Sequence, residues 1–156
     1  MLTQERVHEL LSYDPVSGVF IWLKQRGKVK VGSVAGNPST GGYTQITIDG
    51  VAYMAHRLAW FYVTGEWPRR IDHEDTDRSN NRWGNLRKAT HRQNLANAKK
   101  KQSSTFALKG VGRGTRLNPF RARFAGTHLG VFKTEEKANA AYLRAAQKAH
   151  GEFARG

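Results

Sequence analysis

Residues 71–94 read IDHEDTDRSNNRWGNLRKATHRQN. The segment opens on an adjacent carboxylate and imidazole, Asp72 and His73. After a loop rich in Asp, Asn and Gly it reaches an Asn-Leu pair at residues 85–86. Neighbouring residues of a strand point to opposite sides, so one of the first two side chains can face a metal ion while the other faces a water molecule. Hydrolysis of a phosphodiester needs both an ion at the phosphate and a base for the water.

This segment resembles the HNH family of endonucleases, whose site is a ββα-metal fold (His-Me finger) of two strands, a connecting loop and one helix. The resemblance implies that Asp72 is a metal ligand and that His73 is the general base. Asn85 would brace the connecting loop and orient His73. Asn94, on the helix, would be the second metal ligand. The pattern is the HNN variant, because the third position holds Asn rather than His.

The sequence leaves open which residue of the helix is the metal ligand. His91 and Asn97 lie one helical turn on either side of Asn94, so each can share its face and take its place at a metal or phosphate. Asp72 and Asn94 offer hard oxygen ligands, which favour Mg²⁺ or Mn²⁺. Zinc is expected only if His91 takes the place of Asn94 as the metal ligand on the helix. The chain has no Cys, which excludes disulfides, thiolate zinc sites and zinc fingers.

The residues before this segment are predicted to form two helices and a small antiparallel sheet of hairpins. The expected helices are residues 3–12, capped by Thr3, and residues 55–64, ended by Gly65. The expected strands follow β-branched and aromatic runs at residues 19–23, 29–34, 43–48 and 51–54, with turns at 14–18 and 49–50 and a loop at 36–42.

Several polar residues in this first part have two interpretations. His56, at the start of the second helix, is interpreted first as a structural residue and second as one that approaches the phosphate. The sheet itself is interpreted first as a scaffold. The alternative is that its basic residues touch DNA backbone; these are Lys24, Arg26, Lys28 and Lys30.

Positive charge is concentrated at the C-terminal end. The net charge of +14 divides into +1 for residues 1–54, +3 for residues 55–98 and +10 for residues 99–156, the last from thirteen basic and three acidic residues. A segment this basic indicates a polyanionic partner, with nucleic acid first and an anionic membrane surface second. Membrane adhesion is disfavoured because the basic helix carries few bulky apolar residues.

Residues 109–156 show the pattern of three strands followed by one helix. The expected strands are residues 109–113, 120–124 and 127–132, with a tight turn at residues 125–126. Thr134 is the expected N-cap of the helix. The apolar stripe that would face the sheet is Ala138, Ala141, Tyr142, Ala145 and Ala149.

The runs KGVGR, FRARF, HLGVFKTEEKANAAY and AAQKAHGEFA resemble the plant ethylene-response-factor (Apetala-type) DNA-binding domain. Such a domain lays its sheet in the major groove. The resemblance implies that Arg113, Arg121 and Arg123 face the groove, where Arg can read guanine. Arg116 and Thr127 would lie near the DNA backbone. The basic linker before this module, residues 99–108, carries Lys99, Lys100 and Lys101, which are expected along phosphates.

The sequence therefore predicts an α+β protein: a small antiparallel sheet with a ββα-metal nuclease core, then a three-stranded antiparallel sheet packed on one helix. The expected domains are residues 1–98, with the ββα motif at about 70–98, and residues 109–156. The expected function is a site-selective, single-metal DNA endonuclease of the phage homing or nicking type. Double-stranded DNA is the expected partner, with no membrane and no obligate protein partner, in the cytoplasm of a host cell. The alternatives are a non-catalytic, transcription-factor-like protein and a basic RNA-binding protein.

Overall fold

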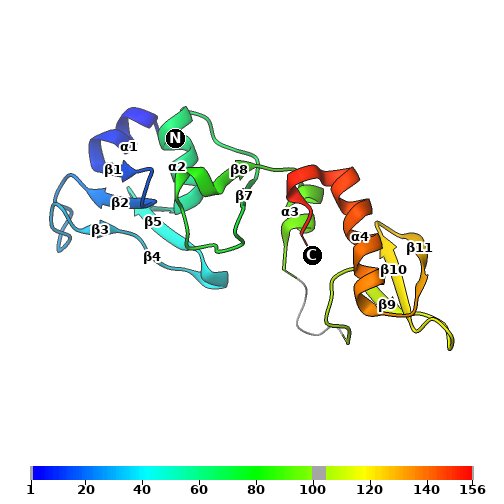
Figure 1. The fold of residues 1–156 in the computed structure, drawn as a ribbon. Coiled ribbons are helices and arrows are strands. Elements are labelled where there is room, and N and C mark those ends of the chain that lie inside the picture. The colour runs from blue at the N-terminus through cyan, green and yellow to red at the C-terminus, as the bar shows by residue number, and fades with distance from the viewer. Residues whose placement is uncertain (1, 100–104, 156) are drawn as a thin grey trace. The chain divides into compact units, whose positions relative to one another are not determined.

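The computed structural model describes residues 2–99 and 105–155 (Figure 1). Backbone contacts divide the chain into two compact units, residues 1–89 and 90–156. Each is described by itself. Both mix helices with small antiparallel sheets, in agreement with the predicted α+β class. The sequence placed the domain boundary after residue 98, whereas the compact units divide after Ala89, so the helix expected to complete the first domain belongs to the second unit.

The first unit begins with helix α1, Gln4–Leu10, whose N-cap Thr3 accepts a hydrogen bond from the Arg6 amide. The prediction that this helix runs to residue 12 was wrong. Leu11 starts strand β1, Leu11–Asp14, where it is fully buried opposite Trp22 of β2, Val19–Trp22. Pairing with a strand that follows in the chain, and burial of Leu11, outweigh its local preference for the helix.

The third strand of this sheet, β3, covers only Val34–Ala35 and pairs with β2. Of the strand predicted over residues 29–34, only Val34 lies in a strand, because the chain before it turns back on itself. Arg26 and Val29 form an isolated bridge around the turn, and the Ser33 hydroxyl donates to the Lys30 carbonyl. The apolar residues from which this strand was predicted therefore lie on the outside of a turn.

A second sheet is formed by β4, Asn37–Pro38, β5, Thr44–Ile48, and β6, Val51–Met54. The hairpin turn is the predicted one. Asp49 and Gly50 both have positive φ, 47° and 80°, as a two-residue hairpin turn of this hand requires. The prediction of a plain loop over residues 36–42 missed β4, whose two residues pair with β5, and a 3₁₀ turn at Thr40–Gly42.

Helix α2, Ala55–Thr64, has the predicted bounds and ends at Gly65, which adopts the left-handed conformation. One face of α2 packs into the core with α1 and the two sheets; its buried members include Val7, Leu11, Phe20, Ile46 and Leu58. After α2 the chain forms strands β7, Ile71–His73, and β8, Leu86–Lys88, which pair antiparallel. A connecting loop, residues 74–85, joins them and contains a 3₁₀ turn at Trp83–Asn85.

The connecting loop is held against the turn between β1 and β2. A Cβ on Gly18 would lie 2.4 Å from the backbone nitrogen of Arg82 and 2.5 Å from the carbonyl carbon of Asn81. Gly18 also has a φ of +76°, so both space and conformation require glycine there. The Trp83 amide donates to the Pro15 carbonyl at 3.0 Å. The far end of the loop therefore has a fixed backbone position.

The second unit begins with helix α3, His91–Asn97, whose Thr90 and Gln93 form a capping box. Strands β9, Val111–Arg113, β10, Phe120–Phe124, and β11, Thr127–Phe132, form a sheet in the order β11-β10-β9. Helix α4, Glu135–His150, begins after Thr134 as predicted and packs on this sheet, and a 3₁₀ turn at Gly151–Phe153 follows. The strands β10 and β11 have their predicted bounds, while β9 is shorter by two residues.

The buried stripe of α4 differs from the predicted one. It consists of Ala138, Asn139, Tyr142 and Ala146, and Ala149 is exposed. Asn139 is buried because its side-chain amide donates to the Lys109 carbonyl at 2.8 Å. Gly110 passes so close to α4 that a Cβ there would lie 2.1 Å from the Tyr142 ring. Within the described residues, no helix is long and apolar enough to cross a membrane.

Candidate functional site

Asp72 and His73 are consecutive residues of β7, and both are buried, with exposed fractions of 4% and 5%. Asp72 is paired across the sheet with Arg87 of β8, whose Nε donates to Asp72 Oδ2 at 3.0 Å. The same guanidinium places Nη1 3.8 Å from a Glu74 carboxylate oxygen. The carboxylate predicted to hold a metal ion is therefore also one half of a largely buried ion pair, which the sequence did not predict.

His73 is a buried imidazole whose ring is favoured in its neutral form. Burial lowers the pKa of His73 below its usual value, while the hydrogen bond to the Asn81 side-chain oxygen and the nearby Asp side chains act in the opposite direction. Its Nε2 lies 3.5 Å from Asn81 Oδ1. A neutral imidazole is the form that accepts a proton, so this shift favours the role of general base near neutral pH.

Asn81 is a candidate site residue that the sequence did not indicate. It is buried, its carbonyl accepts from the Tyr13 hydroxyl at 2.7 Å, and its side-chain amide donates to the Ser79 carbonyl at 3.1 Å. With Gly18 packed against its backbone, its side-chain oxygen is fixed toward His73. In the sequence it is one of several Asn and Asp residues in a loop, and no local pattern distinguishes it from Asn80.

Asn85 ties the two ends of the connecting loop together. Its Oδ1 accepts from the Asp75 amide at 3.0 Å, and its Nδ2 donates to Asp75 Oδ1 at 3.0 Å and to the Asn80 carbonyl at 2.8 Å. Its own carbonyl accepts from the Glu74 amide, next to His73. These bonds hold the backbone on both sides of the loop. The orientation of His73 through Asn85 stays a prediction.

The three candidate residues of α3 differ in exposure. His91, the first residue of the helix, is exposed, Asn94 is half-buried and Asn97 is buried. They belong to the second unit, so the approach of Asn94 to Asp72 stays a prediction. Among the residues that the structure describes, no group of three or more His, Cys, Asp or Glu side chains is arranged to hold a metal ion. The proposed donors, one carboxylate and one amide oxygen, suit an ion such as Mg²⁺ that keeps several water ligands.

A family model described as HNH endonuclease matches residues 53–96. This HNH segment runs from β6 through α2, β7 and β8 into α3, and it contains Asp72, His73, Asn85 and Asn94. The match supports a nuclease, and endonucleases of this family act on DNA. No curated protein and no solved structure matches the chain.

Outside the HNH segment, the predicted DNA-contacting residues of the second unit lie mostly at its surface. The exposed members are Arg113, Arg116, Arg123, Thr127 and Lys99. Arg121 is half-buried, and Arg123 donates to the Gly126 carbonyl at 3.0 Å. A bulge between Ala122 and Arg123 shifts the register of β10 against β11, so the simple alternation assumed from the sequence is broken there. Lys100 and Lys101 lie outside the described residues.

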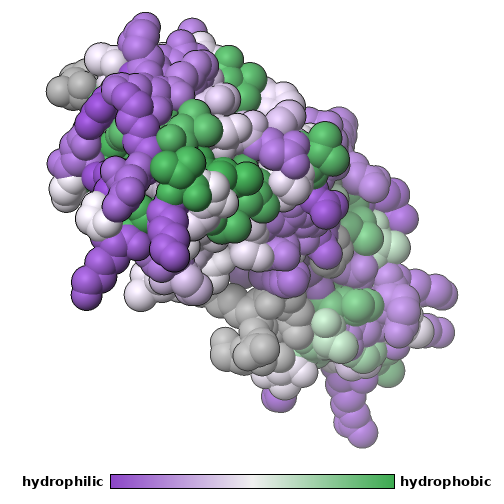
Figure 2. All heavy atoms as spheres, turned by 90° about the vertical axis from the view of Figure 1, so that its left-hand side faces the viewer, coloured by the Kyte–Doolittle hydropathy of each residue, from purple (hydrophilic) through white to green (hydrophobic). Residues whose placement is uncertain are grey.

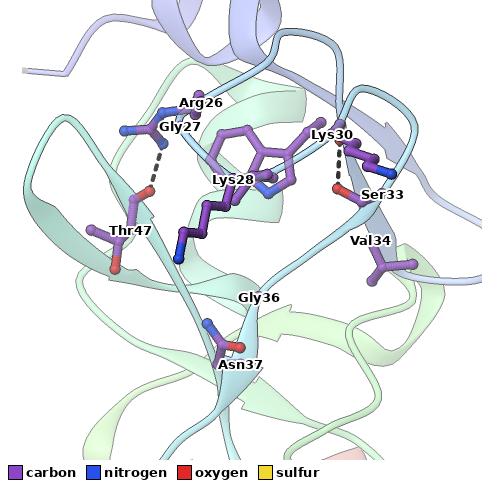
Figure 3. A pocket seen from close by; sticks show the side chains of 11 residues that line it. Arg26, Gly27, Lys28, Lys30, Ser33, Val34, Gly36, Asn37 and Thr47 are labelled. Carbon is purple, nitrogen blue, oxygen red and sulfur yellow. Dashed lines mark hydrogen bonds between the residues drawn. The ribbon is translucent and has the colours of Figure 1, made fainter.

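A basic pocket lies beside the turn between β2 and β3 (Figure 3). Arg26 stacks on the Trp22 ring at 4.7 Å and donates to the Thr47 carbonyl at 2.8 Å, while Lys28 lies between Thr47 and Asn37 in this view. Among the described residues that line the pocket, none is acidic. Figure 2 shows apolar side chains on this face of the first unit between hydrophilic ones. The exposed apolar residues near the pocket are Ile21, Leu23, Val29, Val31 and Val34. Contact of these basic residues with the DNA backbone, the second interpretation of the sheet, stays a prediction.

Proposed function

We propose that this chain is a site-selective DNA endonuclease that hydrolyses phosphodiester bonds in double-stranded DNA, of the phage homing or nicking type. The observation that carries the proposal is the match of residues 53–96 to the HNH endonuclease family. Within this HNH segment, His73 is buried beside a fixed amide oxygen of Asn81, and Asn85 ties the connecting loop. This is the arrangement that a positioned general base needs.

In the proposed mechanism, His73 takes the proton of the attacking water while Asn81 holds its ring. Asp72 and Asn94 would hold one divalent ion, the kind of cofactor that HNH nucleases generally use. When bound, such an ion stabilises the charge that develops on the phosphate and on the leaving oxygen. The products are a 5′-phosphate and a 3′-hydroxyl. One chain carries one such site, so a single chain nicks one strand.

The second unit is proposed to select the site. A three-stranded sheet with exposed Arg113 and Arg123, backed by α4, offers cationic side chains on a scaffold that fits a major groove. The basic pocket of the first unit, around Arg26 and Lys28, would add phosphate contacts that position the DNA without reading its sequence.

The experiment that tests the function is a nicking assay on supercoiled plasmid with the purified chain. We expect conversion to the nicked form with Mg²⁺ or Mn²⁺ and none with EDTA. Competition by unlabelled duplex DNA should inhibit, whereas RNA of equal length should inhibit weakly. Duplex binding without nicking would favour the transcription-factor-like alternative, and preferential competition by RNA would favour the RNA-binding one.

Arg113→Gln tests the proposed base contact in the second unit. If Arg113 reads a guanine, its loss should cost about 1–3 kcal/mol of binding at the preferred site and little on unrelated duplex. The preferred site is obtained by sequencing the ends that the enzyme makes in a DNA library, and affinities are then measured by titration. Lys133→Gln, which removes one exposed charge just after β11, is the matched control. An equal loss on both DNAs would mean that Arg113 contacts only phosphate.

A further inference from the structure

Two aromatic rings from other segments of the first unit, His56 and Tyr43, lie against the His73 ring. The His56 ring, from the second position of α2, lies edge-to-face against His73 with centroids 5.0 Å apart and planes at 68°. Tyr43, which precedes β5, lies 5.1 Å from the His56 ring and 6.0 Å from the His73 ring. Each ring is therefore in contact with the other two.

The contacts that His56 makes with His73 and Tyr43 are ring contacts. The residue is 8% exposed, and among the described residues none forms a hydrogen bond with its buried Nδ1. Burial, with smaller effects of His73 and Arg57, lowers the pKa of His56 to about 3. The side chain is thus a neutral ring at neutral pH, and ring packing fixes its place.

The hydrogen bond to Asn81 does not by itself hold the His73 ring in one orientation. The distance of 3.5 Å from its Nε2 to Asn81 Oδ1 is at the long limit for a hydrogen bond, so that contact leaves the ring some freedom. A base displaced by about 1 Å can lose on the order of a hundredfold in rate. Packing against two further rings removes that freedom.

We propose that His56 is a positioning residue for the reaction: together with Tyr43 it forms an aromatic wall that fixes the His73 ring with Nε2 toward Asn81. The inference rests on the proposed function, because it assigns a role relative to the base of that reaction. It goes beyond that function in assigning catalytic importance to His56, a buried residue of α2 that acts through the His73 ring.

The wall is itself anchored by the connecting loop. The Arg78 guanidinium lies over the Tyr43 ring, 5.0 Å from its centroid, and its Nη1 donates to the Gly41 carbonyl at 2.9 Å. Arg78 and Asn81 belong to the same loop, which Asn85 ties to the end of β7. One loop therefore supplies the hydrogen-bond partner of His73 and also contacts Tyr43, one of the two rings that lie against His73.

The test compares His56→Ala with His56→Phe. Alanine removes the wall, and we expect kcat for nicking to fall by about tenfold to a hundredfold with KM for DNA unchanged. Phenylalanine keeps a neutral ring and should restore kcat to within about threefold. Tyr43→Leu and Tyr43→Phe form a second pair on the other ring, and we expect kcat to be lower in the leucine variant than in the phenylalanine variant. This pair provides the test if thermal unfolding shows that His56→Ala is not folded.

A double-mutant cycle and a spectrum separate positioning from a general loss of stability. In the His73→Ala background, His56→Ala should lower the residual activity no further, because there is no ring left to position. In DNA-free protein, the His73 ring-nitrogen NMR signals should report one tautomer in the wild type and in His56→Phe, and averaged signals in His56→Ala. Unchanged kcat in His56→Ala, or equal losses in the alanine and phenylalanine variants, would overturn the inference. A wild type that binds DNA but does not nick would instead refute the proposed function.

Discussion

Replacing His73 by alanine is expected to lower the rate of nicking by about 10²- to 10⁴-fold, the range that a positioned general base contributes. Duplex binding should be retained, because the ring is buried and neutral and makes no charge contact with a phosphate. The measurement is single-turnover nicking with Mg²⁺ alongside affinity titration. His73→Gln can keep a hydrogen bond to Asn81 but cannot take up the proton, so it should be as slow as alanine.

The control for this experiment is His8→Ala, which removes an exposed imidazole from α1 and should leave the nicking rate unchanged. The pH dependence gives a second check. Only neutral His73 can accept a proton, so kcat/KM should rise with pH through the pKa of the free enzyme and then level off. Because burial lowers that pKa, the rise should be centred below the ordinary histidine pKa of about 6.5. A midpoint at or above 6.5, or a rate that survives in His73→Gln, would assign the proton transfer to another group.

The stability of the protein, like its activity, should fall as the pH is lowered. His56 and His73 are both neutral in the fold at pH values where they are protonated in the unfolded chain. The unfolded state then binds more protons, so stability is complete above about pH 6.5 and falls as the pH drops toward the folded-state values. A loss of activity at low pH is therefore assigned to protonation of His73 only over the pH range in which unfolding curves show that the protein is native.

Elements with strong local signals were predicted correctly from the sequence. The hairpin around Asp49 and Gly50, helix α2 with Gly65 at its end, and the strands β10 and β11 are each defined by residues within one short window. The missed strands β1 and β4 depend on partners elsewhere: Leu11 pairs with Trp22, and Asn37 pairs with Gln45. The residues of β1 and β4 carry no local pattern that predicts a strand in place of the end of a helix or a loop.

The candidate site was predicted only in part for the same reason. Asp72, His73 and Asn85 could be proposed from the sequence because they lie in one motif, and their roles stay predictions. Asn81 acquires its position from Tyr13 and Gly18, more than sixty residues earlier. The ring cluster of Tyr43, His56 and His73 joins three segments, so no spacing in the chain reveals it. The pairing of Asp72 with Arg87 follows from the register of β7 and β8, which the sequence leaves open.

That pairing shapes the second large prediction, which concerns Asp72. Asp72→Ala is expected to abolish Mg²⁺-dependent nicking, because an ion stabilises transition-state charge by several kcal/mol, about a hundredfold or more in rate. The same change removes the carboxylate 3.0 Å from Arg87, a side chain only 14% exposed, and leaves Glu74, at 3.8 Å, as an acidic partner. Removing one partner of a buried ion pair costs about 3–5 kcal/mol of stability, so lost activity in this variant alone has two explanations.

The double variant Asp72→Asn/Arg87→Gln separates these explanations. It removes both charges and keeps side chains of similar shape that can still hydrogen-bond across the two strands. We expect urea unfolding to show stability recovered to within about 1–2 kcal/mol of the wild type, while nicking stays absent and duplex binding persists. If the double variant recovers both stability and nicking, Asp72 has only a structural role as the ion-pair partner of Arg87, and the ion is held elsewhere. Lost nicking in a stable double variant would leave metal binding as the role of this carboxylate, with Arg87 holding it in place until the ion and the phosphate arrive.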